Sequence, residues 1–209
     1  MSKQKTNAAA MLKLGVILAL YAAAACVGLA FVYAGTEKVI AERQQADMKA
    51  ALQELFPAAD DFSAIKDIRN SDPSVIIEEG GAFAALRNGQ TVGAALTVSR
   101  AAYGGAMRLM VGVGTDGKIS GIKILDHSET PGLGANAASA TYYIDRAKGI
   151  HFYDQFAGKS VNDPFVPKQD VTAITAATIT SRAVAASVKA AGEAALAWFA
   201  GSGSQGGVR

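Results

Sequence analysis

Four side-chain hydroxyls near the C-terminal end of this sequence lie close enough together to bind or react with a phosphate group. They belong to Thr175, Thr178, Thr180 and Ser181, and the Ala-rich residues 182–199 that follow predict a helix. The start of a helix has unpaired backbone N–H groups and a partial positive charge, so it can hold a phosphate. A threonine at this position could be esterified to the phosphate of a cofactor. The competing interpretation is ordinary helix capping, the usual role of Ser and Thr before a helix.

A second candidate binding element is the loop with the sequence DHSETPGLG, residues 126–134. Pro131, Gly132 and Gly134 indicate a fixed loop with unusual backbone angles. The loop directly follows a predicted strand, so we expect it to project from the edge of a sheet. The sequence therefore predicts two binding elements, this loop and the start of the C-terminal helix.

Alternating and β-branched residues between these elements and the N-terminus predict strands. The candidates are residues 75–77, 92–99, 107–113 and 118–125, and the last two flank Asp116-Gly117, a strong hairpin signal. Gly104-Gly105 would permit a close backbone approach or a bulge. We predict an α+β domain over residues 71–200, with a mainly antiparallel sheet and packed helices, and a flexible tail at 201–209.

The N-terminal part of the sequence predicts a membrane anchor. Residues 14–33 contain no charged side chain, and this segment is about as long as a helix that crosses a bilayer. Lysines but no acidic residues precede this segment within residues 1–13, so the positive-inside rule places that end in the cytoplasm and the rest of the chain across the membrane. Residues 34–70 read as a helical stalk and linker, with Pro57 ending the helix.

Two alternatives compete with an uncleaved anchor. A cleaved signal peptide would have a shorter apolar core. A lipoprotein that binds a free ligand would carry its modified cysteine at Cys26, after Ala23-Ala24-Ala25. The apolar sequence continues past Cys26 to Tyr33, which favours the anchor and makes Cys26 a small residue within lipid.

Composition excludes several classes of function. The 209-residue chain has a formal net charge of +2 and no basic stripe with interleaved aromatic residues, so no nucleic-acid partner is expected. One cysteine and two histidines argue against a zinc or iron–sulfur site and against an internal disulfide.

Taken together, the loop and the hydroxyl cluster resemble a known family, the FMN-binding domain. This domain occurs in the G subunit of the Rnf electron-transport complex and in the C subunit of the sodium-translocating NADH:quinone reductase. The resemblance covers roughly residues 76–199 and rests on ETPGLG at 129–134, FAGK at 156–159 and AITAATITSRAV at 173–184, with the anchor also matching. The shorter chain favours the Rnf subunit over its relative.

The resemblance implies a covalent-FMN electron carrier with no substrate-converting active site of its own. FMN would be joined through its phosphate to Thr178 by a separate flavin transferase that uses FAD as the donor. The other residues that the resemblance assigns to the cofactor are Thr175, Ala177, Thr180, Ser181, Glu129, Thr130 and Leu133. Thr180 and Ser181 are the expected substitutes for Thr178 as the acceptor, ahead of Thr175. The resemblance also implies a bacterial inner membrane, the other subunits of an ion-translocating complex as partners, and a domain outside the cytoplasm.

Two positions depart from the family's motif, which reads Asp-x-x-Ser/Thr-Gly-Ala-Thr. The glycine of the motif is Ala176 here, and the position of its aspartate is Thr172, with Asp170 two residues out of register. Alanine would fit if the backbone φ at residue 176 were negative and would be strained if it were positive. A rival hypothesis is therefore a flavin-free subunit that keeps the fold and holds such a complex together.

Overall fold

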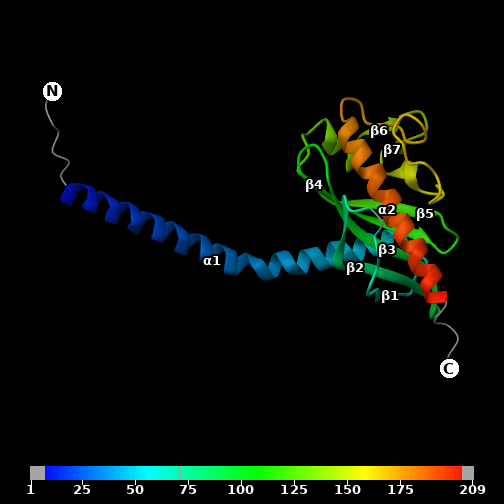
Figure 1. Ribbon diagram of the computed structural model, residues 1–209, viewed down its shortest axis with the longest axis horizontal. Helices are drawn as coiled ribbons and strands as arrows, with labels where there is room; N and C mark the ends of the chain where they lie inside the picture. Colours follow the sequence, from blue (N-terminus) through cyan, green and yellow to red (C-terminus); the bar gives the residue numbers. More distant parts are fainter. Residues whose placement is uncertain (1–7, 71, 204–209) are drawn as a thin grey trace. The chain divides into compact units, whose positions relative to one another are not determined.

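The structure is a computed structural model, and it describes residues 8–70 and 72–203. The chain divides into two units, residues 1–48 and 49–209. Figure 1 labels the elements. In chain order they are α1 (Ala8–Leu55), β1 (Asp61–Ala64), β2 (Val75–Arg87), β3 (Gln90–Ala101), β4 (Ala106–Gly114), β5 (Ile119–Asp126), η1 (Gly134–Ala137), β6 (Tyr143–Asp145), β7 (Ile150–His151), η2 (Asp154–Phe156) and α2 (Thr178–Gly203).

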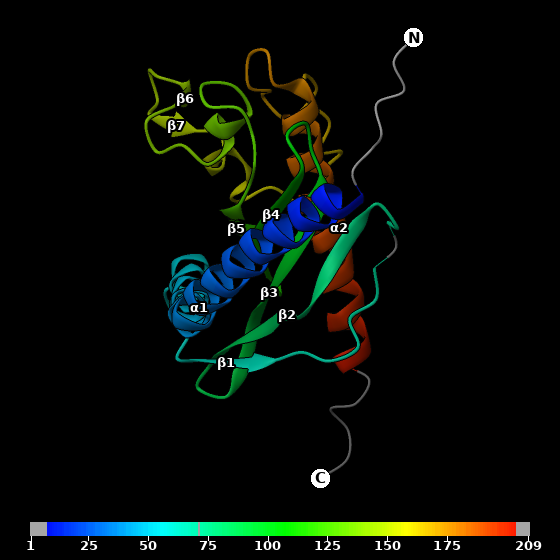
Figure 2. The ribbon, with the colours of Figure 1, turned by 90° about the vertical axis from the view of Figure 1, so that its left-hand side faces the viewer.

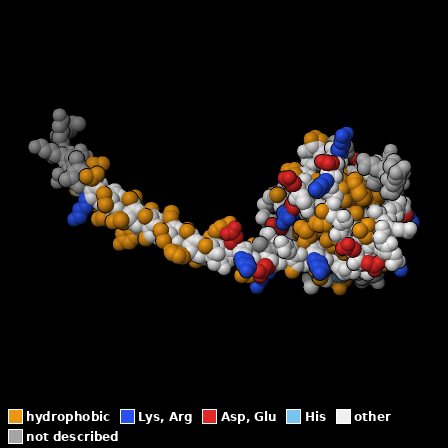
Figure 3. Space-filling view, turned by 90° about the horizontal axis from the view of Figure 1, so that it is seen from below, with side chains coloured by type: hydrophobic (Ala, Val, Ile, Leu, Met, Phe, Trp, Pro, Cys, Tyr) orange, Lys and Arg blue, Asp and Glu red, His pale blue; other side chains and the backbone are white. Residues whose placement is uncertain are grey.

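Helix α1 is 48 residues long and contains the apolar segment predicted as the anchor. Its apolar side chains are exposed all along the uncharged part, as Figure 3 shows for one side of the helix. Leu18 and Leu29, for example, are 71% and 70% exposed. A helix with exposed apolar residues around its whole circumference is suited to a lipid environment. By length and composition α1 could cross a membrane; α2 meets the same criterion, but it is largely buried in the second unit.

The second unit is built on an antiparallel sheet, which within the described residues has five strands in the order β1-β2-β3-β4-β5. Each strand pairs with its neighbour in the chain, so the sheet is a meander. The predicted hairpin at Asp116-Gly117 joins β4 to β5, and Gly117 has a φ of +76°. Strand β2 extends well beyond its predicted end at residue 77, whereas β3 is only slightly longer than predicted. Strand β1 lies in the segment that the sequence predicts to be a linker.

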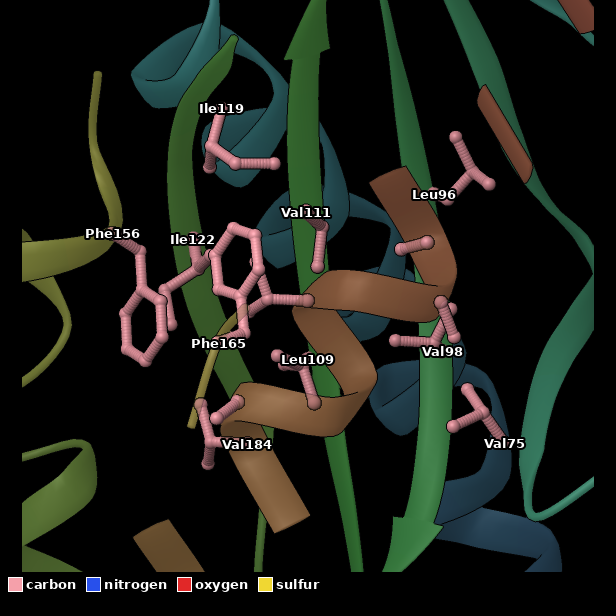
Figure 4. Close-up of a cluster of buried hydrophobic side chains, with 14 of the residues drawn as sticks. Val75, Leu96, Val98, Leu109, Val111, Ile119, Ile122, Phe156, Phe165 and Val184 are labelled. Carbon is pink, nitrogen blue, oxygen red and sulfur yellow. The ribbon is translucent and has the colours of Figure 1, made fainter. Parts of the chain in front are cut away.

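Helix α2 packs across one face of this sheet, and the two form the main hydrophobic core (Figures 1 and 4). Alternate residues of β3 and β4 point toward the helix, including Leu96, Val98, Leu109 and Val111, all fully buried. Val184 lies on the facing side of α2. The small side chains of this Ala-rich helix allow close packing against the strands. The helix begins at Thr178, four residues before the predicted run.

The opposite face of the sheet is covered by the last turns of α1, seen beside the sheet in Figure 2. Leu55 and Phe56 are 6% and 8% exposed. They lie against glycines on three adjacent strands, Gly93, Gly112 and Gly121, where an added Cβ would contact one of these two side chains. Residues 49–56 are therefore part of the core of the second unit rather than a separate spacer.

Candidate functional site

The hydroxyl cluster lies in the first turn of α2 and just before it, where its four members have different surroundings. Ser181 is fully buried, and its hydroxyl donates to the carbonyl of Ala177 at 2.9 Å and accepts the N–H of Ile174 at 2.9 Å. Ala177 also donates its N–H to the Ile174 carbonyl at 3.0 Å. These three hydrogen bonds fasten the loop before the helix to the helix itself. Ser181 is thus a structural residue whose oxygen is already used.

Thr180 is also buried, being 1% exposed, and its hydroxyl donates to Oε2 of Glu129 at 2.8 Å. The burial of Thr180 and Ser181 argues against their substituting for Thr178 as acceptors, because both residues are almost fully buried and both hydroxyls already form hydrogen bonds. Thr178, the first residue of α2, is half-buried, and Thr175 is exposed. Neither of these two side chains forms a hydrogen bond within the residues that the structure describes.

Ala176 has a φ of +59°, in the left-handed region. That region costs an L-residue with a Cβ about 1–2 kcal/mol. The conditional expectation from the sequence is thereby resolved: alanine at this position is strained. The backbone explains why the family's motif has a glycine at this position. The chain turns here before residue 178 begins the helix, and the turn places residue 176 at a positive φ.

The ETPGLG loop meets the same helix start through Glu129. This carboxylate is 7% exposed; its Oε1 accepts the N–H of Gly104 at 2.8 Å, and its Oε2 accepts the Thr180 hydroxyl. One side chain therefore joins the β3–β4 turn, the loop and α2. Glycine is required at two of the meeting points, because a Cβ at Gly104 or Gly134 would collide with this loop or with the Glu129 carboxylate.

A cavity of about 360 Å³ opens between these elements. It is lined by Tyr103, Glu129, Thr130, Leu133, Gly134, Ala176, Ala177, Thr178, Ile179 and Thr180. The structure thus brings together both predicted binding elements, which are about fifty residues apart in the sequence. Thr175 and Ser181 do not line this cavity, although they are close to Thr178 in the sequence.

Tyr103 is a lining residue that the sequence did not predict. It is 71% exposed at the tip of the β3–β4 turn and contributes an aromatic ring to the cavity lining. Ile179 (56% exposed) and Leu133 (41%) add apolar surface to the same lining. The only sequence signal for Tyr103 was its place beside Gly104-Gly105, the pair expected to allow a close approach. The cavity therefore has an exposed apolar lining over a polar base formed by Glu129 and Thr180.

A second, more polar hollow of about 600 Å³ also borders Thr178 and is lined by residues 168–176 together with Thr178 itself. Thr175 and Thr172, at the motif's first hydroxyl and its aspartate position, both line it. The side chain of Gln155 holds the backbone of Thr172, accepting its N–H at 2.7 Å and donating to its carbonyl at 3.2 Å. Within the first turn of α2, Thr178 is the hydroxyl-bearing residue that lines both hollows.

Asp170 fixes the loop that precedes the motif. It accepts the N–H groups of Val166 (2.7 Å) and Phe165 (3.1 Å) and pairs with Lys159 at 3.4 Å. Burial acts to raise the pKa of this carboxyl, but the two N–H groups and Lys159 outweigh it, so the pKa lies below its usual 3.8. Asp170 is thus a structural anchor. It does not stand in for the missing motif aspartate, which would be at the exposed position 172.

Comparison with known proteins agrees with this arrangement. The FMN-binding domain model matches residues 102–193, and the RnfG N-terminal region model matches residues 1–55. The chain is 33% identical over 191 residues to the G subunit of the Na(+)-translocating ferredoxin:NAD(+) oxidoreductase complex of Acetobacterium woodii, covering 84% of this chain and 87% of that protein. It belongs to the RnfG family.

Other members are similar to a comparable degree. The G subunit of the ion-translocating oxidoreductase complex of Aliivibrio fischeri is 31% identical over 201 residues, with 90% of each chain covered. The G subunit of the proton-translocating ferredoxin:NAD(+) oxidoreductase complex of Clostridium ljungdahlii is 32% identical over 170 residues, covering 79% of this chain and 80% of that one. The crystal structure of Shewanella oneidensis NqrC covers 77% of this chain and 99% of its own, with a TM-score of 0.52 and 14% identity. That likeness confirms the α+β fold.

Proposed function

We propose that this chain is the electron-carrier subunit of an Rnf-type membrane complex, and that FMN is joined through its phosphate to Thr178. The observation that carries the proposal is the position of this hydroxyl. Of the four candidates, Thr178 alone combines a place on the cavity lining with a side chain that forms no hydrogen bond in the described residues. It is also the first residue of a long helix, so its phosphate would lie at the positive end of α2.

The residues around the cavity suit a flavin. Leu133, Ile179 and Tyr103 offer apolar and aromatic surface for a flat ring, and the exposed Thr130 offers a hydroxyl for a polar ring edge or the sugar chain. Ala177 is buried beneath them at the base of the motif. FMN would supply the one- and two-electron chemistry, and these residues would orient it and limit its contact with water.

Attachment is a phosphoryl transfer. The Thr178 oxygen would form a bond to the FMN phosphorus of FAD, the phosphoanhydride bond of FAD would break with AMP leaving, and the threonine proton would pass to solvent. As the resemblance to the family implies, a separate flavin transferase would catalyse this step.

The test is the intact mass of the full chain after co-expression with a flavin transferase. We expect the unaltered chain and Thr175→Ala to gain the mass of FMN less water, and Thr178→Ala to gain none. Thr175→Ala is the matched control, because it removes the other exposed hydroxyl of the motif. Flavin on the Thr178→Ala chain would show that another residue is the acceptor, and the double variant with Thr175→Ala would then test Thr175, since Thr180 and Ser181 are buried.

A flavin-free structural subunit is the second candidate, and the strained Ala176 and the missing aspartate at 172 favour it. We expect these departures to weaken flavin loading without abolishing it. Thr172→Asp combined with Ala176→Gly should then raise the flavinylated fraction. Full loading of the unaltered chain would show that the departures are unimportant. No loading after both replacements would refute the electron-carrier proposal.

We further propose that α1 crosses the bacterial inner membrane once, with its N-terminus in the cytoplasm and the FMN domain outside it. The lysines before residue 14 and the exposed apolar surface of α1 support this topology. The partners would be membrane lipid and the other subunits of the complex. A reporter that is active only outside the cytoplasm, fused after Arg209, should be active. The topology would be refuted if a cytoplasmic reporter at the same site were active instead.

A further inference from the structure

Glu129 combines three properties that the proposed function does not by itself explain. Its carboxylate is 7% exposed, lines the cavity beside Thr178, and accepts hydrogen bonds from two neutral groups, the Gly104 N–H and the Thr180 hydroxyl. A buried carboxylate is costly unless it is hydrogen-bonded, and a neutral glutamine or a smaller polar residue could satisfy the same donors. The two hydrogen bonds therefore do not explain why the residue at this position carries a negative charge.

The charge of Glu129 is not cancelled by a basic side chain. Among the residues that the structure describes, no lysine, arginine or histidine forms an ion pair with it. The ring of His127 accepts the backbone N–H of Glu129 at 3.3 Å, which is a contact with the backbone and not with the carboxylate. The start of α2, through Thr180, supplies partial positive charge that offsets part of the cost. The carboxylate charge at the base of the cavity is therefore offset by hydrogen-bond donors and the helix start, and not by a paired cation among the described residues.

We propose that Glu129 lowers the reduction potential of the bound flavin. The proposal rests on the proposed function, because it requires FMN in the cavity next to Thr178. Reduction adds negative charge to a flavin, and a fixed carboxylate in a poorly hydrated site disfavours that addition more than it would in water. The same side chain therefore has two roles. It joins the three elements of the site, and its charge favours the oxidised flavin.

The substitution Glu129→Gln separates these two roles. Its amide oxygen can accept the Gly104 N–H, and its amide nitrogen can donate to the Thr180 hydroxyl, which is able to rotate and accept. The variant thus keeps both links while losing the charge. We expect the flavin of Glu129→Gln to be reduced more easily, by about tenfold in the ratio of reduced to oxidised flavin at a fixed potential. For one electron this corresponds to a shift of about +59 mV.

Two control variants change one property at a time. Thr180→Val removes the hydroxyl donor but retains the charge, so the potential should stay the same or fall. Asp126→Asn removes the same unit of charge from an exposed position three residues earlier, outside the cavity lining, so water should screen the change and leave the potential unaltered. A purely structural role of Glu129 would leave the potential of Glu129→Gln unshifted, because both links remain, and would affect only Thr180→Val, which loses one of them.

The experiment is a redox titration of the purified full chain in detergent, followed by flavin absorbance, with the melting of the flavin-free chain recorded in parallel. A positive shift in Glu129→Gln, with none in Asp126→Asn and none or a negative shift in Thr180→Val, would support the proposal. An unshifted or lowered potential in Glu129→Gln, or a raised one in Thr180→Val, would overturn it. If Glu129→Gln fails to fold, a raised potential in Thr180→Val would still overturn the proposal, and an unchanged or lowered one would support it. Absence of covalent flavin from every chain, the unaltered one included, would instead refute the proposed function.

Discussion

Replacing Ala176 by glycine should stabilise the domain, although the same replacement elsewhere normally destabilises it. The residue has a φ of +59°, and relieving the left-handed strain of alanine is worth about 1–2 kcal/mol. Glycine gains freedom in the unfolded chain, which costs about 0.4–1 kcal/mol. Ala176 is exposed, so the methyl group buries little surface that would be lost. The net expectation is a gain of about 0–1.6 kcal/mol, centred on about 0.8 kcal/mol, in the free energy of unfolding.

The suitable assay is thermal unfolding of the full chain in detergent, monitored with a spectroscopic signal that arises from the second unit. For a domain of this size a gain of about 1 kcal/mol raises the melting temperature by about 2–4 °C. Ala173→Gly is the matched control, since Ala173 lies three residues earlier and is not among the described residues with positive φ. It should show only the cost of added freedom, about 0.4–1 kcal/mol.

The comparison between the two variants decides the reasoning. Opposite signs at residues 176 and 173 would confirm that the loop before α2 needs a left-handed residue. Equal destabilisation would show that the φ at Ala176 is not positive in solution. The glycine of the family's motif would then need another explanation, such as contact with the transferase.

Three further outcomes are expected. Leu55→Ala should destabilise the second unit by about 2–5 kcal/mol in urea unfolding, because its side chain fills the space above the strand glycines, whereas Leu29→Ala on the exposed part of α1 should leave it unchanged. Asp170→Asn should cost about 1–3 kcal/mol at pH 7; since the folded pKa of Asp170 lies below 3.8, the difference from the unaltered chain should persist above that pH and shrink as the pH falls through the folded value. Tyr103→Ala should make the fluorescence of bound flavin respond more strongly to a soluble quencher, because the ring lines the cavity, and an unchanged response would place the flavin away from Tyr103.

Much of the fold could be predicted because it depends on short-range patterns. The β4–β5 hairpin follows from Asp116-Gly117 and the alternation around it, and the anchor from an uncharged run. The starts and ends of elements were less predictable. Helix α2 begins at Thr178 because the Ser181 side chain fastens the preceding loop to the first turn of the helix. Residue propensities alone could not distinguish this contact from ordinary helix capping.

The site was predicted in outline but not in its internal division. The sequence places four hydroxyls close together, but their burial differs. Thr180 and Ser181 are buried and bind neighbouring loops, whereas Thr178 is half-buried and Thr175 is exposed. Neither Glu129's link to Gly104 nor the place of Tyr103 could be inferred, because both depend on how the β3–β4 turn meets a loop 25 residues away. Likewise, the role of residues 49–56 depends on strand glycines far along the chain.

The separation of the hydroxyls explains how one threonine among several could be selected for attachment. Ser181 and Thr180 sit on the buried side of the first turn of α2, so their oxygens are bound before any phosphate arrives. Thr175 lines the polar hollow and lies three residues before the first residue of the helix. Of the four hydroxyls, only that of Thr178 lies on the cavity at the helix start and forms no hydrogen bond in the described residues. Selectivity would then follow from the fold of the acceptor, in which burial excludes two hydroxyls and position excludes the third.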